Sequence, residues 1–321
     1  MTRIILLFTV ILTSAFTHAR PAQPPVKPYL ELLSDKEVKE KYSFVVNIAK
    51  GFNGFVAEDR RIVVTVAHGF FDPSGHQQAT KTELFDPHPW YWKNGNFHIG
   101  NATIELVFPE CGNRTYYPKH IVFGGKLLPR GGLELLKTQD YAVILLNEPV
   151  CESVKPVKIR GINLNNSRYI NPEFINLNMG NTQLSIITGL FSQIVKESWS
   201  SKKPIREPFG VYRTGGTDLT WDGVDGENPS KSFSIVSSAR STSGMSGSPC
   251  LIEALSRDPI AIGLVEGHFE IGGRAICTAF GTDFLNSFYS VVKAMNKRPE
   301  DYPIKFLSDE WFDPREPVTF N

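Results

Sequence analysis

Three short segments of the 321-residue chain carry side chains suited to nucleophilic chemistry: Ile62-Val-Val-Thr-Val-Ala-His68, Asp140-Tyr-Ala-Val-Ile-Leu-Leu146 and Ser243-Gly-Met-Ser246-Gly-Ser-Pro-Cys250. A serine hydroxyl needs an adjacent general base, which a histidine supplies near neutral pH, while a buried carboxylate fixes the tautomer of the imidazole. Glycines beside the serine let backbone N–H groups converge on a developing oxyanion. Together the segments predict acyl transfer by Ser246, with His68 as base and Asp140 orienting it.

Each segment also has a structural explanation when it is taken alone. A histidine at a strand end commonly has a structural role, an aspartate there caps a turn, and a Ser/Gly run is commonly a flexible loop. Three other histidines (His76, His88 and His98) fit no helical ligand motif, and no Cys or Glu pair stands in register with them. We therefore expect no metal site and no cofactor, and the ordered set of three segments favours catalysis.

Elements that would position these residues begin at Tyr42, where short β-branched and aromatic runs alternate with Gly, Asn, Asp and Pro clusters. This pattern is typical of an all-β sandwich or barrel. Strands are predicted over 44–48, 54–57, 62–67, 103–108, 121–123, 141–146, 184–188, 232–237, 251–253, 261–265 and 275–280. One helix is predicted over 282–297, with a Thr282/Asp283 cap, and the polar stretches 70–100 and 196–231 are expected to be long loops.

The two ends of the chain differ from this middle part. Arg3, an apolar run from Ile4 to Phe16, and small residues before a cut after Ala19 predict a secretory signal peptide over 1–19. A retained membrane anchor is the alternative. Residues 20–41 are expected to be a leader or linker, and the four prolines of 298–321 predict an extended tail. The protein is therefore expected to be secreted or periplasmic.

Composition and charge narrow the function classes. The chain is 41% hydrophobic and 21% charged, which excludes intrinsic disorder, and it has no internal apolar run of membrane-spanning length. Its formal net charge is +1, and removing Arg3 with the signal peptide leaves 33 basic and 33 acidic residues. This balance argues against binding to nucleic acid or to an anionic membrane. We expect a monomer whose partners are protein or peptide substrates.

The ordered motifs resemble the chymotrypsin-like (trypsin-like) serine peptidases. The resemblance is nearer to the bacterial glutamyl-endopeptidase type, whose nucleophile motif reads Ser-Gly-Ser-Pro where trypsin has Ser-Gly-Gly-Pro. It covers roughly residues 42–297 and rests on Tyr42-Ser-Phe-Val-Val-Asn-Ile48, Asn53-Gly-Phe-Val56, Thr65-Val-Ala-His68, Asp140-Tyr-Ala-Val-Ile-Leu-Leu146, Gly244-Met-Ser246-Gly-Ser-Pro249 and Ile262-Gly-Leu-Val-Glu-Gly267. It implies two six-stranded antiparallel β-barrels, about 42–155 and 156–281, then a helix over 282–297, with the site between the barrels.

The resemblance also implies roles for individual residues. His68, Asp140 and Ser246 would form the catalytic triad of a serine endopeptidase, and the N–H groups of Gly244 and Ser246 would form the oxyanion hole. The segment Val265, Glu266 and Gly267 would pair with the substrate backbone. Arg240 lies six residues before Ser246, where the family places the floor of the specificity pocket, and with His268 nearby it would favour an acidic side chain. Alternatively, Arg240 points to solvent.

Two rival functions stay open at this point. One is a catalytically silent homologue of the same fold that acts as a binding module, and the other is an unrelated structural all-β protein. Departures from the family are also informative: Met245 stands where trypsin-type zymogens have an aspartate, and no Ile-Val-Gly-Gly start precedes Tyr42. Activation is therefore not expected to use that buried ion pair. The extra length between His68 and Asp140 falls in the aromatic loop 70–100, which is expected to pack across the outside of the first barrel. A cleft-side exosite is the alternative.

Four cysteines allow three pairings, and export would permit disulfides. Cys111 and Cys151 both follow strands of the first half, which favours their pairing. Cys250 and Cys277 are expected on strands separated by another strand, about 9–10 Å apart and too far to bond.

Overall fold

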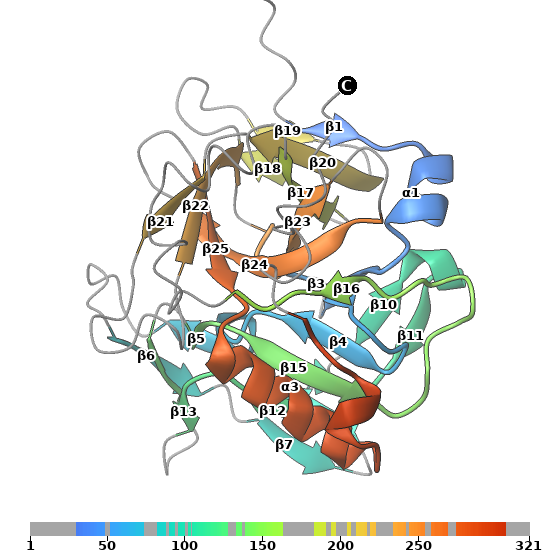
Figure 1. Ribbon diagram of the computed structural model, residues 1–321, viewed down its shortest axis with the longest axis vertical. Coiled ribbons are helices and arrows are strands. Elements are labelled where there is room, and N and C mark those ends of the chain that lie inside the picture. Colours follow the sequence, from blue (N-terminus) through green and yellow to red (C-terminus); the bar gives the residue numbers. More distant parts are fainter. Residues whose placement is uncertain are drawn as a thin grey trace, which may run out of the picture.

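Two curled antiparallel sheets and a C-terminal helix form the body of the chain (Figure 1). The computed structural model describes residues 30–48, 52–73, 82–87, 90–93, 96–99, 102–103, 105–127, 133–136, 139–162, 183–190, 194–196, 204–206, 210–216, 219–222, 234–241, 244–253, 258–268 and 274–305. The predicted signal peptide and the aromatic residues of the tail, Phe306, Trp311 and Phe312, lie outside them. The predicted all-β class, with strands gathered in two antiparallel sheets and one C-terminal helix, is confirmed.

The first sheet is built from residues 45–146 and carries two of the three predicted catalytic residues at strand ends. Its β-branched and aromatic runs suit a pleated surface that is packed on both sides. In spatial order its strands are β11 (Arg114–Tyr116), β10 (Leu106–Phe108), β2 (Val45–Ile48), β3 (Phe52–Val56), β4 (Ile62–Thr65), β15 (Ala142–Leu146) and β12 (Pro118–Phe123).

The second sheet is larger and collects almost all of its strands from the later part of the chain. Its order is β1 (Glu31–Leu32), β20 (Gly210–Gly216), β17 (Gln183–Leu190), β23 (Pro249–Glu253), β24 (Ile260–His268), β25 (Arg274–Ala279), β22 (Ser234–Arg240) and β21 (Leu219–Asp222). A further strand, β16 (Lys158–Ile159), pairs in parallel with β24. The sheets hold seven and nine described strands where six each were expected, because short strands such as β1, β11 and β16 extend them.

Both segments expected as long loops contain strands. Within 70–100 lie β5 (Phe71–Pro73), β6 (Thr82–Pro87), β7 (Trp90–Lys93) and β8 (Asn96–Ile99). They form small sheets with β9 (Ala102–Thr103), β13 (Lys126–Leu127) and β14 (Leu133–Leu136). Within 196–231 lie β19 (Pro204–Arg206), β20 and β21, and β19 forms a hairpin with β18 (Ile194–Lys196) at the edge of this segment. The prediction failed because Pro, Gly and Asn, which are typical of loops, also occur in sequences that contain several short strands.

The main helix, α3 (Thr282–Ala294), closes the open side of the first sheet (Figure 1). Its apolar residues follow the predicted helical spacing, and Phe284, Phe288 and Val292 are buried. The N-cap is Gly281 and makes no side-chain cap, so the predicted Thr282/Asp283 cap is wrong by one position. Asp283 lies instead in the first turn, where its charge complements the helix dipole. None of the helices in the described ranges is long and apolar enough to cross a membrane.

Residues 30–41, expected as a leader or linker, are folded onto the second sheet. Strand β1 pairs with β20, and Glu31 forms an ion pair with Arg213 at 2.9 Å. Helix α1 (Asp35–Lys41) begins with a capping box between Ser34 and Glu37. The Tyr42 hydroxyl then donates to Glu253 on β23, and burial together with this carboxylate raises the pKa of Tyr42. The folded domain therefore begins before Tyr42.

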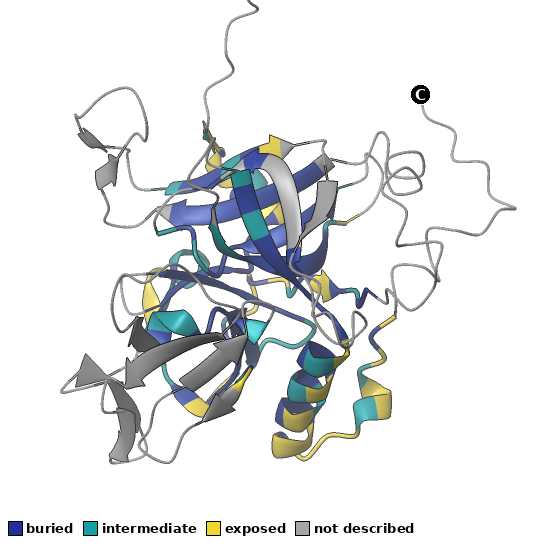
Figure 2. Ribbon diagram, turned by 90° about the vertical axis from the view of Figure 1, so that its left-hand side faces the viewer, coloured by how far each residue is buried: buried dark blue, intermediate teal, exposed yellow. Residues whose placement is uncertain are grey.

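The hydrophobic core joins the two sheets (Figure 2). Its larger cluster contains the inner residues of the first sheet and of α3, and it continues into the second sheet through Ile187, Val211, Leu251, Ala261 and Leu264. A smaller cluster fills the inside of the second sheet. Because one continuous apolar cluster spans both sheets, residues at their boundary are held by packing from both sides.

Both disulfides are formed, one as expected and one against expectation. Cys111 pairs with Cys151, with a Cα–Cα distance of 5.7 Å. Cys250 also pairs with Cys277, at 6.5 Å, although β24 separates their strands. The flat-sheet spacing does not apply here because register shifts occur next to Cys250 and next to Val265, the partner of Cys277. Such bulges bend a sheet, and the bend brings the outer two strands within bonding distance.

Peptide mapping without reduction is expected to recover both pairs, Cys111–Cys151 and Cys250–Cys277. The double variant Cys250→Ala/Cys277→Ala should lower the free energy of unfolding by about 2–4 kcal/mol, measured by urea denaturation, because it frees a loop of the unfolded chain. The double variant Cys111→Ala/Cys151→Ala is the matched control for losing a disulfide elsewhere. A Cys250 peptide that is recovered with a free thiol or linked to Cys111 would contradict the described sheet.

Candidate active site

His68 and Asp140 meet because of the register between two neighbouring strands. Thr65 of β4 lies opposite Ala142 of β15 in this antiparallel pair. Ala67 lies two residues after Thr65, and Asp140 lies two residues before Ala142. Ala67 and Asp140 therefore lie at the same end of this strand pair. His68 follows at the start of the short 3₁₀ helix η1 (His68–Phe70). The structure thus brings together two predicted residues that are 72 positions apart.

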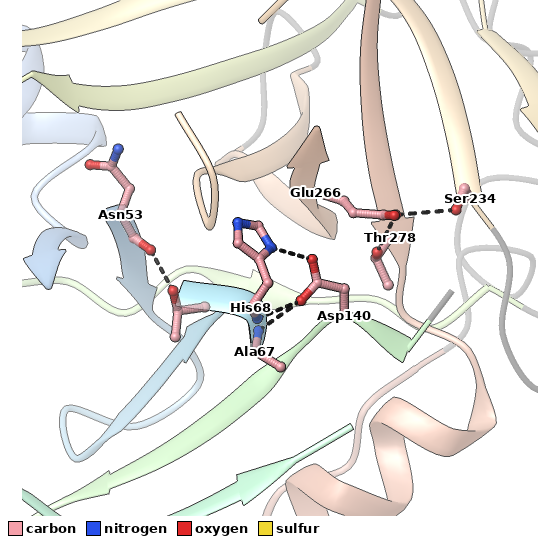
Figure 3. A network of polar contacts seen from close by, with 8 residues as sticks. Asn53, Ala67, His68, Asp140, Ser234, Glu266 and Thr278 are labelled. Atoms are coloured by element: carbon pink, nitrogen blue, oxygen red, sulfur yellow. Dashed lines mark hydrogen bonds and ion pairs between the residues drawn. The ribbon is translucent and has the colours of Figure 1, made fainter. Parts of the chain in front are cut away.

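The carboxylate of Asp140 holds both the ring and the backbone of His68 (Figure 3). One oxygen, Oδ2, lies 2.5 Å from His68 Nδ1. The other, Oδ1, accepts the main-chain N–H groups of Ala67 at 3.0 Å and of His68 at 2.8 Å. Because an ionised carboxylate only accepts, Nδ1 must carry the proton, which makes Nε2 the basic nitrogen of neutral His68.

His68 is more exposed to solvent than Asp140, as expected for a general base and the carboxylate that orients it. The side chain of Asp140 is 7% exposed, whereas that of His68 is 29% exposed. The carboxylate is therefore held away from solvent while the imidazole stays accessible. The turn that carries Asp140 is also fixed, since Tyr141 packs against Phe284 of α3 and Gly124 lies so close that a Cβ would be 2.1 Å from the Gln139 carbonyl oxygen.

Ser246 lies in a tight loop between two glycines with left-handed backbone. Gly244 has φ +93° and Gly247 has φ +82°, which only glycine adopts without strain. The N–H of Ser248 donates to the carbonyl of Met245 at 3.0 Å and closes the turn. The loop is joined to β24 by Gly247 N–H to Val265 O and by Val265 N–H to Ser248 O, each at 2.8 Å.

The Ser246 loop packs against the first sheet near His68. The main-chain N–H of Asn53, on β3, donates to the carbonyl of Ser246 at 2.8 Å. A Cβ on Gly247 would lie 1.9 Å from the Asn53 carbonyl oxygen and 2.5 Å from Thr65 Oγ1. Thr65 lies three residues before His68, so the loop rests on the strand that leads into the histidine. Met245, where zymogens of the family have an aspartate, is fully buried in the core of the second sheet.

The residues predicted to bind substrate lie around the ends of β22 and β24. Arg240 ends β22 opposite Arg274, and His268 ends β24 opposite Ala275. Val265 is buried and uses both main-chain groups in the bonds to the Ser246 loop. The prediction that Val265 pairs with the substrate backbone is therefore wrong, because the N–H and carbonyl groups of Val265 already have partners within the protein.

Glu266 and Gly267 follow Val265 on β24. The Glu266 carboxylate accepts the Thr278 hydroxyl at 3.0 Å and the Ser234 hydroxyl at 3.5 Å (Figure 3). The carbonyl of Gly267 accepts the Ser241 hydroxyl at 2.8 Å. Of the three loop histidines, His76 and His88 lie outside the described residues and His98 lies on β8. No group of three metal-ligating side chains gathers in the part of the chain that the structure describes.

Sequence reasoning missed Asn53, although the side chain contacts the loop of the predicted nucleophile. Its amide donates to the carbonyl of Gly244 at 2.6 Å, and the residue is fully buried. A signal was present, since Asn53 is a polar residue within an otherwise apolar strand and buried polar groups require partners. The sequence offered no means of naming those partners.

Comparisons with known proteins add little to this description. No protein-family model matches the chain, and no curated protein matches it. Among solved structures, the chain is similar to one titled "Structure of Glu endopeptidase in complex with MPD". The match has a TM-score of 0.47 and 12% sequence identity, and it covers 83% of this chain and 96% of that chain.

Replacement of Gly247 tests the packing of the loop. We expect Gly247→Ala to cost more than about 2 kcal/mol in the free energy of unfolding, because it adds a clash with the Asn53 carbonyl to the strain of a left-handed alanine. Gly112→Ala is the matched control, since Gly112 has φ +66° but its Cβ would meet nothing within 4 Å. Equal losses in urea denaturation for the two variants would show that the loop does not rest on Asn53.

Proposed function

We propose that this chain is an exported serine endopeptidase that cleaves peptide bonds through an acyl-enzyme. The observation that carries the proposal is the contact of His68 Nδ1 with Asp140 Oδ2 at 2.5 Å, beside a loop that presents Ser246 between two left-handed glycines. The two disulfides support export, because such bonds form and persist mainly in oxidising compartments.

Each residue has one role in the proposed reaction. The Ser246 hydroxyl attacks the scissile carbonyl carbon while His68 Nε2 takes its proton. Asp140 keeps the imidazole in the required tautomer and stabilises the imidazolium that forms. His68 then returns the proton to the leaving amine, and a water molecule that is activated in the same way releases the acid and regenerates Ser246.

Charge that develops on the carbonyl oxygen needs donors that are already in place. The N–H groups of Gly244 and Ser246 are assigned this role, which preorganised donors typically fulfil with a rate contribution of about 10²–10³. Pairing with the substrate backbone is assigned to Glu266 and Gly267, which follow Val265 on β24. These assignments rest on the loop geometry together with the resemblance of the motifs.

Active-site labelling separates the enzyme from a silent binding module. A fluorophosphonate is expected to form one adduct with the wild-type chain and none with Ser246→Ala. Asp140→Asn should slow labelling by on the order of 10⁴-fold, because the imidazole then adopts the wrong tautomer.

Ser248→Ala is the matched control for this experiment. Ser248 lies two residues from Ser246, is fully buried, and its Oγ has no hydrogen-bond partner within the described part of the chain. Its replacement should leave the labelling rate close to that of the wild-type chain. If the wild-type chain acquires no Ser246-dependent adduct, the proposed enzyme function is wrong.

A side-chain preference is proposed from the position of Arg240 at the end of β22. The backbones of Arg240 and Arg274 lie opposite one another, so a pocket floor at Arg240 would attract an acidic side chain. Cleavage of matched peptides ending in Glu, Arg or Phe should then be fastest after Glu, and Arg240→Gln should remove the preference without abolishing cleavage. A wild-type preference for Arg or Phe would exclude Arg240 from the pocket.

A further inference from the structure

Asn53 is the one residue of the first sheet whose side chain and backbone both bond to the Ser246 loop among the described contacts. It lies in the middle of β3, and none of its surface is exposed. A buried carboxamide with no partner is costly, and an apolar residue would suit a strand interior better. The groups that the Asn53 side chain binds must therefore account for a polar residue at this position.

The carboxamide has a single consistent orientation. Its Oδ1 accepts the main-chain N–H of Gly189 at 3.1 Å, and its Nδ2 donates to Thr188 Oγ1 at 3.1 Å and to the Gly244 carbonyl at 2.6 Å. A backbone N–H can only donate and a carbonyl can only accept, so exchanging Oδ1 and Nδ2 would break two of these three bonds. Gly189 and Thr188 on β17 thus fix the direction in which Nδ2 points at the loop.

The loop bonds fix three consecutive peptide planes around Ser246. The Gly244 carbonyl is held by Asn53 Nδ2 at 2.6 Å, and the Ser246 carbonyl by the Asn53 main-chain N–H at 2.8 Å. The carbonyl between them, of Met245, accepts the Ser248 N–H at 3.0 Å. Two of the three planes are therefore held by Asn53, and the middle plane carries the N–H of Ser246.

These hydrogen bonds matter because the glycines on either side of Ser246 place few limits on the backbone angles of the loop. Gly244, with φ +93°, has no side chain that limits its backbone angles, and Gly247 follows Ser246 directly. A rotation at either glycine would turn the neighbouring N–H groups away from a substrate carbonyl. Oxyanion donors act only when they are already aimed at the developing charge.

We propose that Asn53 is a positioning residue. By holding the carbonyls of Gly244 and Ser246 from the opposite sheet, it fixes the peptide planes that adjoin those carrying the N–H groups of Gly244 and Ser246, and so aims these two donors. This role rests on the proposed function. Asn53 makes no described contact with His68 or Asp140, so it acts on the oxyanion donors and not on the base. The two effects are separable by experiment.

The test measures the rate constant and the final stoichiometry of fluorophosphonate labelling across a range of pH. Asn53→Asp keeps the shape and the acceptor for Gly189 but puts an oxygen against the Gly244 carbonyl. We expect labelling to slow by about 10–10³-fold, while the final stoichiometry stays at one label per chain. The midpoint of the pH–rate profile is compared in Asn53→Ala, which adds no charge, and it should stay unchanged there, since the His68–Asp140 pair is not touched.

Asn47→Asp is the matched control. Asn47 is the register partner of Asn53 in the same hairpin, is 8% exposed, and donates from Nδ2 to the Phe52 carbonyl at 3.3 Å. It carries the same substitution without contacting the loop, so its labelling rate should stay within about threefold of the wild-type rate, far from the loss expected for an oxyanion donor. Should Asn53→Asp fail to unfold cooperatively in urea, Asn53→Ala, which adds no charge, is measured in its place with the same expected slowing.

The outcomes distinguish the two proposals. Ser246-dependent labelling that is equally fast in the wild-type chain and the Asn53 variant would overturn the positioning role and leave the proposed function intact. Equal slowing in Asn47→Asp, or a shifted pH midpoint in Asn53→Ala, would mean a general loss of structure and would also overturn it. A wild-type chain without a Ser246-dependent label would overturn the proposed function, and the positioning role with it.

Discussion

The hydrogen bonds that Asp140 accepts are the interaction on which the rest of the site depends. A buried carboxylate is unfavourable unless its oxygens have partners, and here they bond to two backbone N–H groups and one ring nitrogen. The bonds require β4 and β15 to pair in one register. A shift by one residue would move Asp140 to the other face of the sheet, so the fold and the candidate chemistry are specified by the same strand pairing.

The candidate site also depends on how the two sheets pack against each other. His68 and Asp140 lie at strand ends of the first sheet, whereas Ser246 lies between β22 and β23 of the second sheet. Their relative placement is therefore a matter of packing between sheets, which the shared core cluster and the bonds of Asn53 provide. Loops at such a boundary gain precision from rigid elements on both sides.

The parts of the fold that could be predicted from the sequence are the strands and the helix that local residue patterns specify. The run Ile62-Val-Val-Thr65 is β-branched, and the apolar stripe after Thr282 has helical spacing, so both elements lie close to their predicted positions. His68, Asp140 and Ser246 could be selected because their chemistry constrains residue type.

The rest depends on distances in space that no local pattern encodes. The Cys250–Cys277 bond required knowledge of how far bulges bend the sheet. The partners of Asn53 lie 135, 136 and 191 positions away, so their identity follows only from the assembled fold. The ordered segment 31–41 was missed because its charged residues resemble a solvated linker, although Glu31 and Ser34 have specific partners.

Strand β1, from the N-terminal side, completes the edge of the second sheet, while α3, near the C-terminal side, covers the first sheet. The first half therefore cannot bury its apolar face when its own residues leave the ribosome, since Phe284 and Phe288 are synthesised more than a hundred residues later. Burial of the apolar face of the first sheet must therefore wait until α3 has been synthesised.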